Sequence, residues 1–369
     1  MNTEFGILDT LLPLRSLAAH NFERRAVDLS PEWTGWDVLP GRSLNPCLPP
    51  LYSTRRIAMI QADKVVFTKY TGGGSGPLNL YLRKNMSTDN LDGKVAVITG
   101  AAGGFGAVLV RGMLAQGAKV AALDVNERGL RALATALPEG KADRLFTSVT
   151  DIADYDACER ATAAAVQALG AVHILVNNGA IGMGAIRPDH MSNLVGIEEI
   201  HPQMWQRFVD VNFTGAWNMT RVAFPYLRAQ RWGRIIDVTT SFFTMLRGGF
   251  HPYGPCKAAL EAMAAGHAKE FEGTGVTVNV VVPGGPSDTP MVPAESGMER
   301  SALIPPSVMV PPVLWLCSEA AQEITGNRYI ACHWNATQPA EQAERQCRAP
   351  IAWPDLAQSP VWPGGKPAR

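Results

Sequence analysis

The sequence lacks the features that mark several specialised classes of protein. Its six cysteines include no C-x-x-C pair, and their spread indicates free thiols in a reducing compartment, not a disulfide framework or a zinc site. No apolar run approaches the length that spans a bilayer, and no basic start precedes the short apolar stretch near the N-terminus, as it would in a signal peptide. We therefore expect a cytoplasmic protein with no metal site and no membrane partner.

The sequence also lacks an excess of charge of either sign. Its 33 basic residues balance its 33 acidic residues, so nothing predicts electrostatic attraction to nucleic acid. Hydrophobic residues make up 46% of the 369 positions, which is ample for a buried core in one large domain or two. A nucleic-acid partner is therefore not expected.

The first 85 residues have little apolar periodicity. They are rich in proline, contain a Thr-Gly-Gly-Gly-Ser-Gly-Pro tract, and offer one short possible strand at 64–67. Met86 stands just before the first convincing strand, so we expect the folded part to be 86–335. We interpret 1–85 as a disordered extension or a mis-assigned start, with a small docking segment as the alternative, and 336–369 as an irregular tail.

The stretch 94–106, KVAVITGAAGGFG, is the most informative part of the chain. An apolar β-branched run suits a strand buried on both faces of a parallel sheet, and a glycine-rich turn and a helical pattern follow it. A second apolar run then ends in Asp124. Strand, glycine turn, helix and strand, closed by an acid about 20 residues on, form the pattern of a dinucleotide-binding βαβ unit.

The residue types in this unit fit the chemistry of a dinucleotide. A pyrophosphate needs backbone N–H donors and the positive end of a helix at close range, and glycine lets the chain approach it. Asp124 can accept hydrogen bonds from both ribose hydroxyls of the adenosine and would repel a 2′-phosphate. No Arg or Lys in the turn or directly after Asp124 would bind such a phosphate. The sequence therefore favours NAD over NADP.

From residue 94 onward, strand and helix patterns alternate. Strands are expected at 95–98, 120–123, 145–149, 174–177, 234–238, 276–282 and 328–331. Helices are expected at 104–116, 127–137, 155–169, 204–229, 253–273 and 306–317. This order predicts an α/β, Rossmann-like, doubly wound fold whose seven-stranded parallel sheet carries helices on both faces.

A second informative stretch contains Tyr253 and Lys257. The two residues are four apart at the start of a strongly helical run, so they are expected on one face of a helix. A neighbouring ammonium stabilises a phenolate and lowers the tyrosine pKa toward the working range of a general acid or base. Thr240 lies 13 residues earlier at the end of a strand, where open α/β sheets bind ligands. The less specific interpretation of Thr240 is a strand-end cap.

With these landmarks, residues 94–335 resemble the compact short-chain dehydrogenase/reductase family. Residues 99–106 match its T-G-x-x-x-G-x-G turn, and they also fit the spacing of longer epimerase-like relatives because Gly103 is glycine. Only 112 residues follow Lys257, too few for the extra substrate domain of those relatives. Residues 177–180 take the place of the family's N-N-A-G, Asn212 that of its helix asparagine, and 283–284 that of its P-G turn.

The resemblance implies a role for each matching residue. Tyr253 would exchange a proton with the substrate oxygen, and Lys257 would lower the tyrosine pKa and hold the nicotinamide ribose. Thr240 or Ser241 would hydrogen-bond the substrate oxygen, and Asn212 would hold a water that links Lys257 to solvent. The implied cofactor-binding residues are Gly100, Gly103, Gly104, Phe105, Gly106, Asp124, Val125, Ser148, Val149, Asn178, Gly179, Tyr253, Lys257, Pro283, Gly284 and Thr289.

The chain departs from the family pattern at several of these positions. Thr240 stands in place of the usual serine, and Ser241 is one step out of register. Residues 179–180 exchange the family's alanine and glycine, and Ser148 stands where an aspartate usually contacts the adenine. Thr289 comes one residue late, which makes Asp288 a rival for contact with the carboxamide.

We therefore predict an NAD-dependent oxidoreductase that interconverts a secondary alcohol and a ketone. The apolar residues of the loop 242–250 favour an apolar or aromatic substrate, and the resemblance implies a homodimer or homotetramer. One alternative is a catalytically idle relative that binds dinucleotide as a sensor or scaffold. Another is an enzyme that reduces a C=C or C=N bond on the same scaffold.

Overall fold

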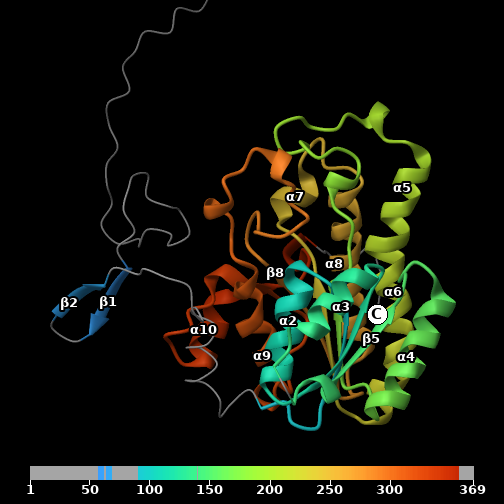
Figure 1. Ribbon diagram of the computed structural model, residues 1–369, viewed down its shortest axis with the longest axis vertical. Coiled ribbons are helices and arrows are strands. Elements are labelled where there is room, and N and C mark those ends of the chain that lie inside the picture. Colours follow the sequence, from blue (N-terminus) through green and yellow to red (C-terminus); the bar gives the residue numbers. More distant parts are fainter. Residues whose placement is uncertain (1–56, 62–63, 69–89, 139, 357–369) are drawn as a thin grey trace, which may run out of the picture. The chain divides into compact units, whose positions relative to one another are not determined.

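The computed structural model describes residues 57–61, 64–68, 90–138 and 140–356 (Figure 1). Its main feature is an eight-stranded sheet in the order β10-β9-β8-β7-β6-β3-β4-β5. Seven neighbouring strands are parallel, and β10 at the edge is antiparallel to β9. The strands are β3 (Val95–Thr99), β4 (Lys119–Asp124), β5 (Leu145–Val149), β6 (Ile174–Asn177), β7 (Gly233–Val238), β8 (Val276–Val282), β9 (Asn327–Ile330) and β10 (Arg348–Pro350).

The strand order reverses between β3 and β6, and this reversal determines where a ligand can bind. β3 pairs with β4 on one side and with β6 on the other. In open α/β sheets, the crevice at such a reversal lies outside the carboxyl ends of the strands. The predicted parallel, doubly wound sheet is therefore confirmed, with one extra antiparallel strand.

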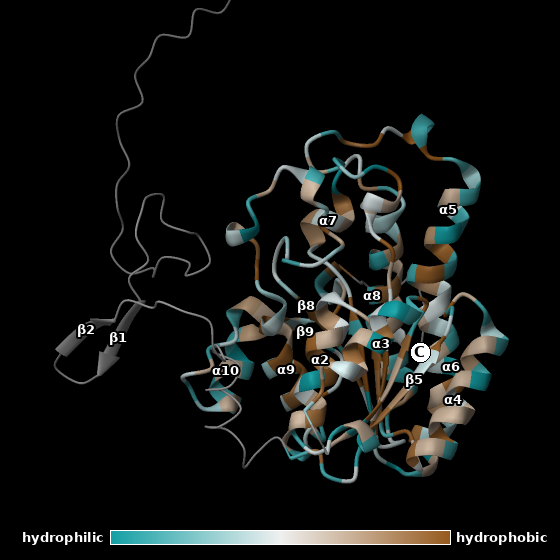
Figure 2. Ribbon diagram, in the orientation of Figure 1, coloured by the Kyte–Doolittle hydropathy of each residue, from teal (hydrophilic) through white to brown (hydrophobic). Residues whose placement is uncertain are grey.

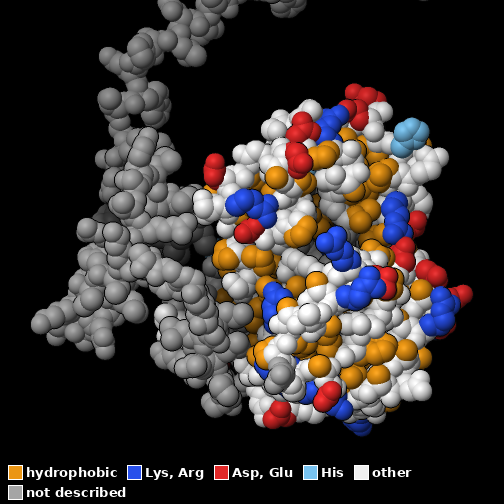
Figure 3. All heavy atoms as spheres, viewed as in Figure 1, with side chains coloured by type: hydrophobic (Ala, Val, Ile, Leu, Met, Phe, Trp, Pro, Cys, Tyr) orange, Lys and Arg blue, Asp and Glu red, His pale blue; other side chains and the backbone are white. Residues whose placement is uncertain are grey.

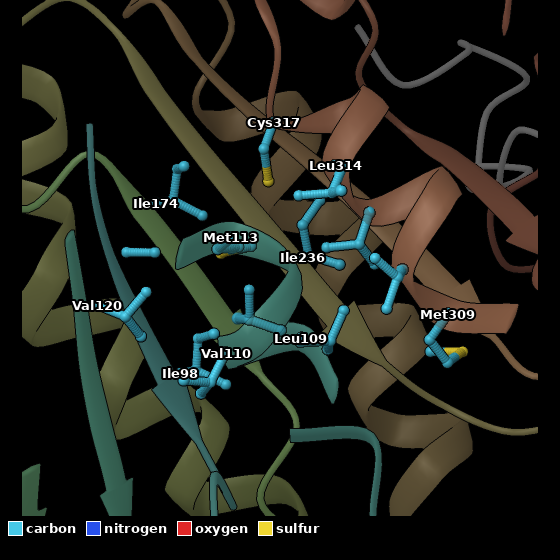
Figure 4. Close-up of a cluster of buried hydrophobic side chains, with 14 of the residues drawn as sticks. Ile98, Leu109, Val110, Met113, Val120, Ile174, Ile236, Met309, Leu314 and Cys317 are labelled. Carbon is cyan, nitrogen blue, oxygen red and sulfur yellow. The ribbon is translucent and has the colours of Figure 1, made fainter. Parts of the chain in front are cut away.

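Helices cover both faces of the sheet (Figure 1). On one face, side chains of α2 and α9 pack with alternate residues of β3, β4, β6 and β7 in one core cluster, which Figure 4 shows. On the other face, α4, α6 and α8 pack against the intervening residues of the same strands. Figure 2 shows the resulting hydrophobic strands between the helical layers. The helices are α2 (Gly104–Ala115), α3 (Glu127–Thr135), α4 (Tyr155–Leu169), α5 (Pro202–Val209), α6 (Gly215–Ala229), α7 (Phe242–Leu246), α8 (Tyr253–Glu270), α9 (Val310–Leu316) and α10 (Ala340–Cys347).

The long helix expected at 204–229 is not a regular α-helix. α5 begins at Pro202, and a π-helical segment, Asp210–Thr214, separates it from α6. Such segments are inserted into α-helices frequently at functional sites, and this one contains Asn212. The apolar pattern alone could not reveal it, because a widened turn leaves the apolar face of the flanking helices intact.

The tail expected to be irregular at 336–369 contains the helix α10 and the strand β10. α10 is fixed from within the core, because the Tyr329 hydroxyl donates to Glu344 at 2.9 Å. β10 has three residue pairs and ends at Pro350, which has no backbone N–H to continue a ladder. So short a strand carries no periodic signal, which explains why the sequence analysis missed it.

The described residues before position 69 form a two-stranded antiparallel hairpin of β1 (Ile57–Gln61) and β2 (Lys64–Thr68). The strand expected at 64–67 is therefore present. The rest of 1–85 lies outside the described residues, and our interpretation of that segment stays a prediction.

The surface of the described part carries charges of both signs. Figure 3 shows Lys and Arg interspersed with Asp and Glu on the face in view, separated by neutral and apolar atoms. None of the helices that the structure describes has the length and hydrophobicity needed to cross a membrane.

Candidate active site

The glycine turn connects β3 to α2 at the reversal of strand order. Gly100 has φ +64°, and a Cβ there would lie 2.8 Å from the Cα of Gly179. A Cβ on Gly106 would lie 2.1 Å from the carbonyl oxygen of Gly100. A side chain at either position would push the turn apart, so the sequence pattern corresponds to a packing requirement in the structure.

The N-terminus of α2 has backbone donors available for an anion. Gly103 caps this helix without any side-chain hydrogen bond, and its first turn contains no acidic residue. The first N–H groups of an α-helix have no partner within the helix, and the helix dipole favours negative charge there. Gly103, Gly104 and Phe105 therefore fit the pyrophosphate of a dinucleotide.

Asp124 holds the glycine turn against the end of β4. Its carboxylate accepts hydrogen bonds from the backbone N–H of Ala102 at 2.9 Å and of Asn126 at 2.8 Å. The side chain remains partly exposed, so lone pairs are left for ribose hydroxyls. Val125 and Val149, 59% and 58% exposed, follow at the carboxyl ends of adjacent strands. They provide an open apolar surface of the kind an adenine ring covers.

Ser148 and Asn178 are occupied by contacts within the protein. The Ser148 hydroxyl accepts a hydrogen bond from Thr150 at 3.1 Å. The Asn178 amide donates to the carbonyl oxygens of Thr99 at 2.9 Å and Gly100 at 3.1 Å. In this structure the Asn178 side chain thus fixes the glycine turn, and its amide N–H groups do not point to a ribose.

Thr99 is a positioning residue that our site prediction omitted. Its hydroxyl accepts hydrogen bonds from the N–H groups of Asn178 at 3.0 Å and Gly179 at 2.9 Å. It also donates to the Val176 carbonyl at 3.3 Å. The sequence did contain a signal for this role, because Thr99 is the first residue of the T-G-x-x-x-G-x-G pattern. Its hydrogen bonds join the end of β3 to the end of β6.

Thr240, Ser241 and Tyr253 come together at the end of β7, and the structure separates the two candidate hydroxyls. The Thr240 hydroxyl lies near the Tyr253 phenol and lowers the pKa of that phenol. Ser241 instead caps α7, because its hydroxyl accepts from the Thr244 N–H at 3.1 Å and pairs with the Thr244 hydroxyl at 2.9 Å. Thr240 is therefore the hydroxyl that accompanies the tyrosine.

Lys257 lies one turn after Tyr253 on α8 and is 2% exposed. Its ammonium donates to the Val238 carbonyl at 2.7 Å. Burial lowers the pKa of Lys257 to about 8, and the nearby Asp237 and Cys256 oppose this shift. The lysine therefore titrates near neutral pH.

In this structure Lys257 is not among the groups that change the pKa of Tyr253. Burial raises the pKa of Tyr253 to about 12, and the neighbouring Thr240 lowers it. Because Lys257 donates to the Val238 carbonyl, its expected effect on the tyrosine stays a prediction.

Asn212 is buried in the π-helical segment and clamps the loop after β6. Its side-chain oxygen accepts from the Ile181 N–H at 2.8 Å, and its amide donates to the Ile181 carbonyl at 2.9 Å. The side chain thus holds both backbone groups of one residue, and the expected water link from Asn212 to Lys257 stays a prediction.

The segment after β8 reaches back to the glycine turn. Pro283 and Gly284 follow the strand, and a Cβ on Gly104 would lie 3.3 Å from the side chain of Thr289. Asp288 instead forms a surface ion pair with Arg300. Thr289, and not its rival Asp288, therefore faces the cofactor-binding turn.

A buried ion pair behind Thr240 also escaped the sequence analysis. Arg328 on β9 pairs with Glu261 on α8, and the two side chains are 4% and 0% exposed. Arg328 also donates to the Thr240 carbonyl at 2.7 Å, and Thr239 donates to Glu261 at 2.8 Å. This pair fixes the backbone that carries the candidate catalytic hydroxyl.

The loop 242–250 is partly core and partly surface. Met245 and Phe250 are buried, whereas Phe243 and Leu246 are 72% and 80% exposed. The exposed pair lies on α7, directly after the Thr240 strand end. Within the described part of the chain, no three His, Cys, Asp or Glu side chains gather in a way that would hold a metal ion.

Comparison with known proteins identifies the family. The family model described as short chain dehydrogenase matches residues 94–300. A 2,5-dichloro-2,5-cyclohexadiene-1,4-diol dehydrogenase of Sphingobium indicum is 33% identical over 247 residues, which cover 64% of this chain and 94% of that protein. A 2,3-dihydroxy-2,3-dihydro-p-cumate dehydrogenase of Pseudomonas putida is 34% identical over 193 residues, 52% of this chain and 71% of that protein.

A solved structure agrees with these sequence relatives. A 3-ketoacyl-(acyl-carrier-protein) reductase from Brucella melitensis, complexed with NADH, has a TM-score of 0.57 and 26% identity to this chain. The alignment covers 65% of this chain and 96% of the reductase. The glycine turn, the tyrosine and lysine of α8 and the strands β3 to β8 all lie within residues 94–300. The chain belongs to the short-chain dehydrogenase/reductase family of oxidoreductases.

Proposed function

We propose that this protein is an NAD-dependent dehydrogenase that interconverts a secondary alcohol and a ketone. The observation that carries the proposal is the grouping of Thr240 and Tyr253, whose hydroxyls interact, with Lys257 one helical turn away on α8. These groups lie at the carboxyl edge of the sheet, where the glycine turn offers its unpaired backbone donors.

When bound, a nicotinamide dinucleotide supplies the hydride chemistry. In the direction of ketone reduction, the Tyr253 hydroxyl gives its proton to the substrate oxygen, and in alcohol oxidation it takes that proton back. Thr240 holds the same oxygen by a hydrogen bond and orients the tyrosine. Lys257 holds the nicotinamide ribose with its ammonium, which burial keeps away from bulk water.

The preference for NAD rests on Asp124. Its carboxylate lies at the end of β4, and the structure fixes it through the N–H groups of Ala102 and Asn126. A carboxylate in this position accepts from ribose hydroxyls and repels a 2′-phosphate. The similar Brucella reductase was solved with NADH, which supports the same class of cofactor.

We propose an apolar, ring-containing alcohol as the substrate class. Phe243 and Leu246 expose their side chains beside the strand end that carries Thr240. The names of the two similar dehydrogenases describe diols of six-membered carbon rings. We also propose that the chain self-associates through α6, where Trp217 and Tyr226 are 43% and 37% exposed.

The raised pKa of Tyr253 favours one competing proposal. A phenol with a pKa of about 12 stays protonated at neutral pH, so little phenolate is available to accept a proton, as expected in an idle relative that binds dinucleotide without turnover. A reductase of C=C or C=N bonds, the other alternative, would also use this cofactor site, with the proton that completes the reduction supplied by water or by a group other than Tyr253.

Cofactor binding by the full chain tests the proposal first. We expect NADH to bind more tightly than NADPH, measured by energy transfer from the tryptophans to the reduced nicotinamide. Asp124→Ala should weaken NADH binding about 10- to 100-fold and reduce the discrimination against NADPH, because hydrogen bonds to a charged group contribute about 1.5–3 kcal/mol. Asp288→Ala is the matched control, since that carboxylate pairs only on the surface.

A screen of cyclic alcohols and ketones with the bound cofactor then separates the alternatives. Turnover that Tyr253→Phe lowers about 10²- to 10⁴-fold would support the dehydrogenase. Binding of NADH without turnover of any alcohol, ketone, enone or imine would support the idle relative, and turnover that Tyr253→Phe leaves unchanged would contradict the acid/base role.

A further inference from the structure

Asp237 is a buried carboxylate that the proposed chemistry does not use. It lies on β7 directly opposite Asn177 of β6, and its exposed fraction is 0%. The Asn177 amide donates to Asp237 at 2.8 Å and to the Thr220 hydroxyl at 3.0 Å. The three side chains form a small polar cluster between the sheet and α6, and we call it the Asp237 cluster.

The hydrogen bonding of the Asp237 cluster is incomplete. The second carboxylate oxygen of Asp237 and the side-chain oxygen of Asn177 are buried without a hydrogen-bond partner among the described residues. Leaving such a group unsatisfied costs about 1–3 kcal/mol, and more for a charged group. A purely structural cluster would be expected to avoid that cost, so another interaction must account for the carboxylate.

That interaction is electrostatic and involves Lys257. The Lys257 ammonium donates to the carbonyl of Val238, the residue next to Asp237, at 2.7 Å. The positive charge of Lys257 lowers the pKa of Asp237, and the negative charge of Asp237 raises the pKa of Lys257. The two buried groups therefore stabilise each other in their charged forms.

Few other charges act on these two groups. Besides Asp237, only Cys256 influences the pKa of Lys257, and burial raises the pKa of that thiol to about 11, so it is neutral at pH 7. The groups that act on Asp237 are the Asn177 amide and Lys257. Asp237 is thus the negative charge that opposes the desolvation of Lys257.

We propose that Asp237 is a positioning residue, the counter-ion that keeps Lys257 protonated at the pH where the enzyme works. The inference rests on the proposed function, in which the Lys257 ammonium holds the nicotinamide ribose. With a pKa of about 8, Lys257 is mostly charged at pH 7, and loss of the Asp237 charge lowers that pKa, so that a larger fraction of the lysine is neutral. A neutral amine loses the charge-assisted hydrogen bonds to the ribose hydroxyls.

The test is the pH dependence of NADH affinity in the full chain between pH 6 and pH 10. In the unmodified protein, we expect affinity to fall as Lys257 loses its proton, with a midpoint near 8. In Asp237→Asn, which has nearly the same shape, the midpoint should move about 1–3 units to lower pH, the usual effect of one nearby opposite charge. Asp237→Ser repeats the test with a smaller side chain, and a urea titration confirms that each variant is folded.

Thr220→Val is the matched control, because it removes a hydroxyl from the Asp237 cluster without changing its charge. The midpoint in Thr220→Val should equal that of the unmodified protein. If both Asp237 variants fold and keep the original midpoint, Asp237 is not the counter-ion and the inference is overturned.

Lys257→Met distinguishes this failure from a failure of the proposed function. This variant should bind NADH weakly, and its NADH affinity should show no pH transition with a midpoint near 8. If Lys257→Met keeps full affinity and the original pH dependence, Lys257 does not hold the cofactor, and the proposed role of the lysine is wrong whatever Asp237 does. If Lys257→Met loses the transition but the Asp237 variants keep it, only the counter-ion inference fails.

Discussion

Two pairs of opposite buried charges lie where α8 packs against β7, and they differ in how well their polar atoms are hydrogen-bonded. Arg328 and Glu261 form a direct ion pair, whereas Asp237 and Lys257 influence each other's pKa without a direct ion pair among the described residues. Arg328 and Glu261 share hydrogen bonds with Thr239, the Thr240 carbonyl and the N–H of Ala352. Asp237 and Lys257 have a single hydrogen bond each, to Asn177 and to the Val238 carbonyl. One carboxylate oxygen of Asp237 has no partner among the described residues.

The difference indicates what each pair does. A buried ion pair offsets its desolvation only when the remaining donors and acceptors are also paired. The Arg328–Glu261 pair meets this condition and joins α8, β9 and the segment after β10 to the Thr240 backbone. The Asp237–Lys257 pair does not meet it, and we interpret it as stability given up for a charged lysine at the site.

Breaking the fully hydrogen-bonded pair of Arg328 and Glu261 should have the largest effect on stability. We expect Glu261→Gln to lower the free energy of unfolding by about 3–5 kcal/mol, because it leaves the Arg328 charge buried without a counter-ion. Lys269→Gln, in an exposed pair with Glu272 on the same side of the sheet, should cost at most about 1 kcal/mol. Equal urea midpoints for Glu261→Gln and Lys269→Gln would show that the buried pair contributes no stability.

The hydroxyls of Thr240 and Ser241 lie beside these charges, and substituting each should separate an effect on catalysis from an effect on stability. Thr240→Val should lower kcat/KM about 10²- to 10³-fold with little change in stability, because it removes a hydrogen-bond donor aimed at the reacting oxygen. Ser241→Ala should cost about 1 kcal/mol of stability as a lost helix cap and leave kcat/KM nearly unchanged. The reverse pattern would identify Ser241 as the catalytic hydroxyl.

Much of the fold could be predicted from the sequence because its signals are local. The apolar runs of β3 to β9 and the turn from Thr99 to Gly106 depend on neighbouring residues, and the structure confirms them. β10 could not be predicted, since three residues ending in proline have no periodicity of their own. The π-helical segment was missed because it depends on a contact between Asn212 and Ile181, 31 positions away.

The sequence predicted most residues of the candidate site, but it could not predict which of their charged and polar groups interact. The spacing of Tyr253 and Lys257 placed both on α8, yet it could not show that Lys257 points to Val238 and leaves Tyr253 with a raised pKa. Arg328 and Asp237 were not predicted, because each lies inside an apolar strand pattern where its partner comes from another element. Only the packing of α8 on the sheet brings these charges together.

The last prediction tests whether the buried Asp237 carboxylate lowers the stability of the folded protein. Burial raises the pKa of Asp237 from an ordinary value of 3.8 to about 6. Between these values the unfolded chain has lost a proton that the folded chain still holds, so folding is favoured below pH 3.8 and this contribution is lost as the pH rises to 6. The unmodified protein should therefore lose stability relative to Asp237→Asn across this window, by up to about 1.4 kcal/mol per pH unit. Urea unfolding of both proteins at pH 4, 5 and 6 measures the difference, and Thr220→Val should follow the unmodified protein. A difference that stays constant with pH would mean that Asp237 ionises as easily in the folded state as in the unfolded state, and that its burial does not lower stability.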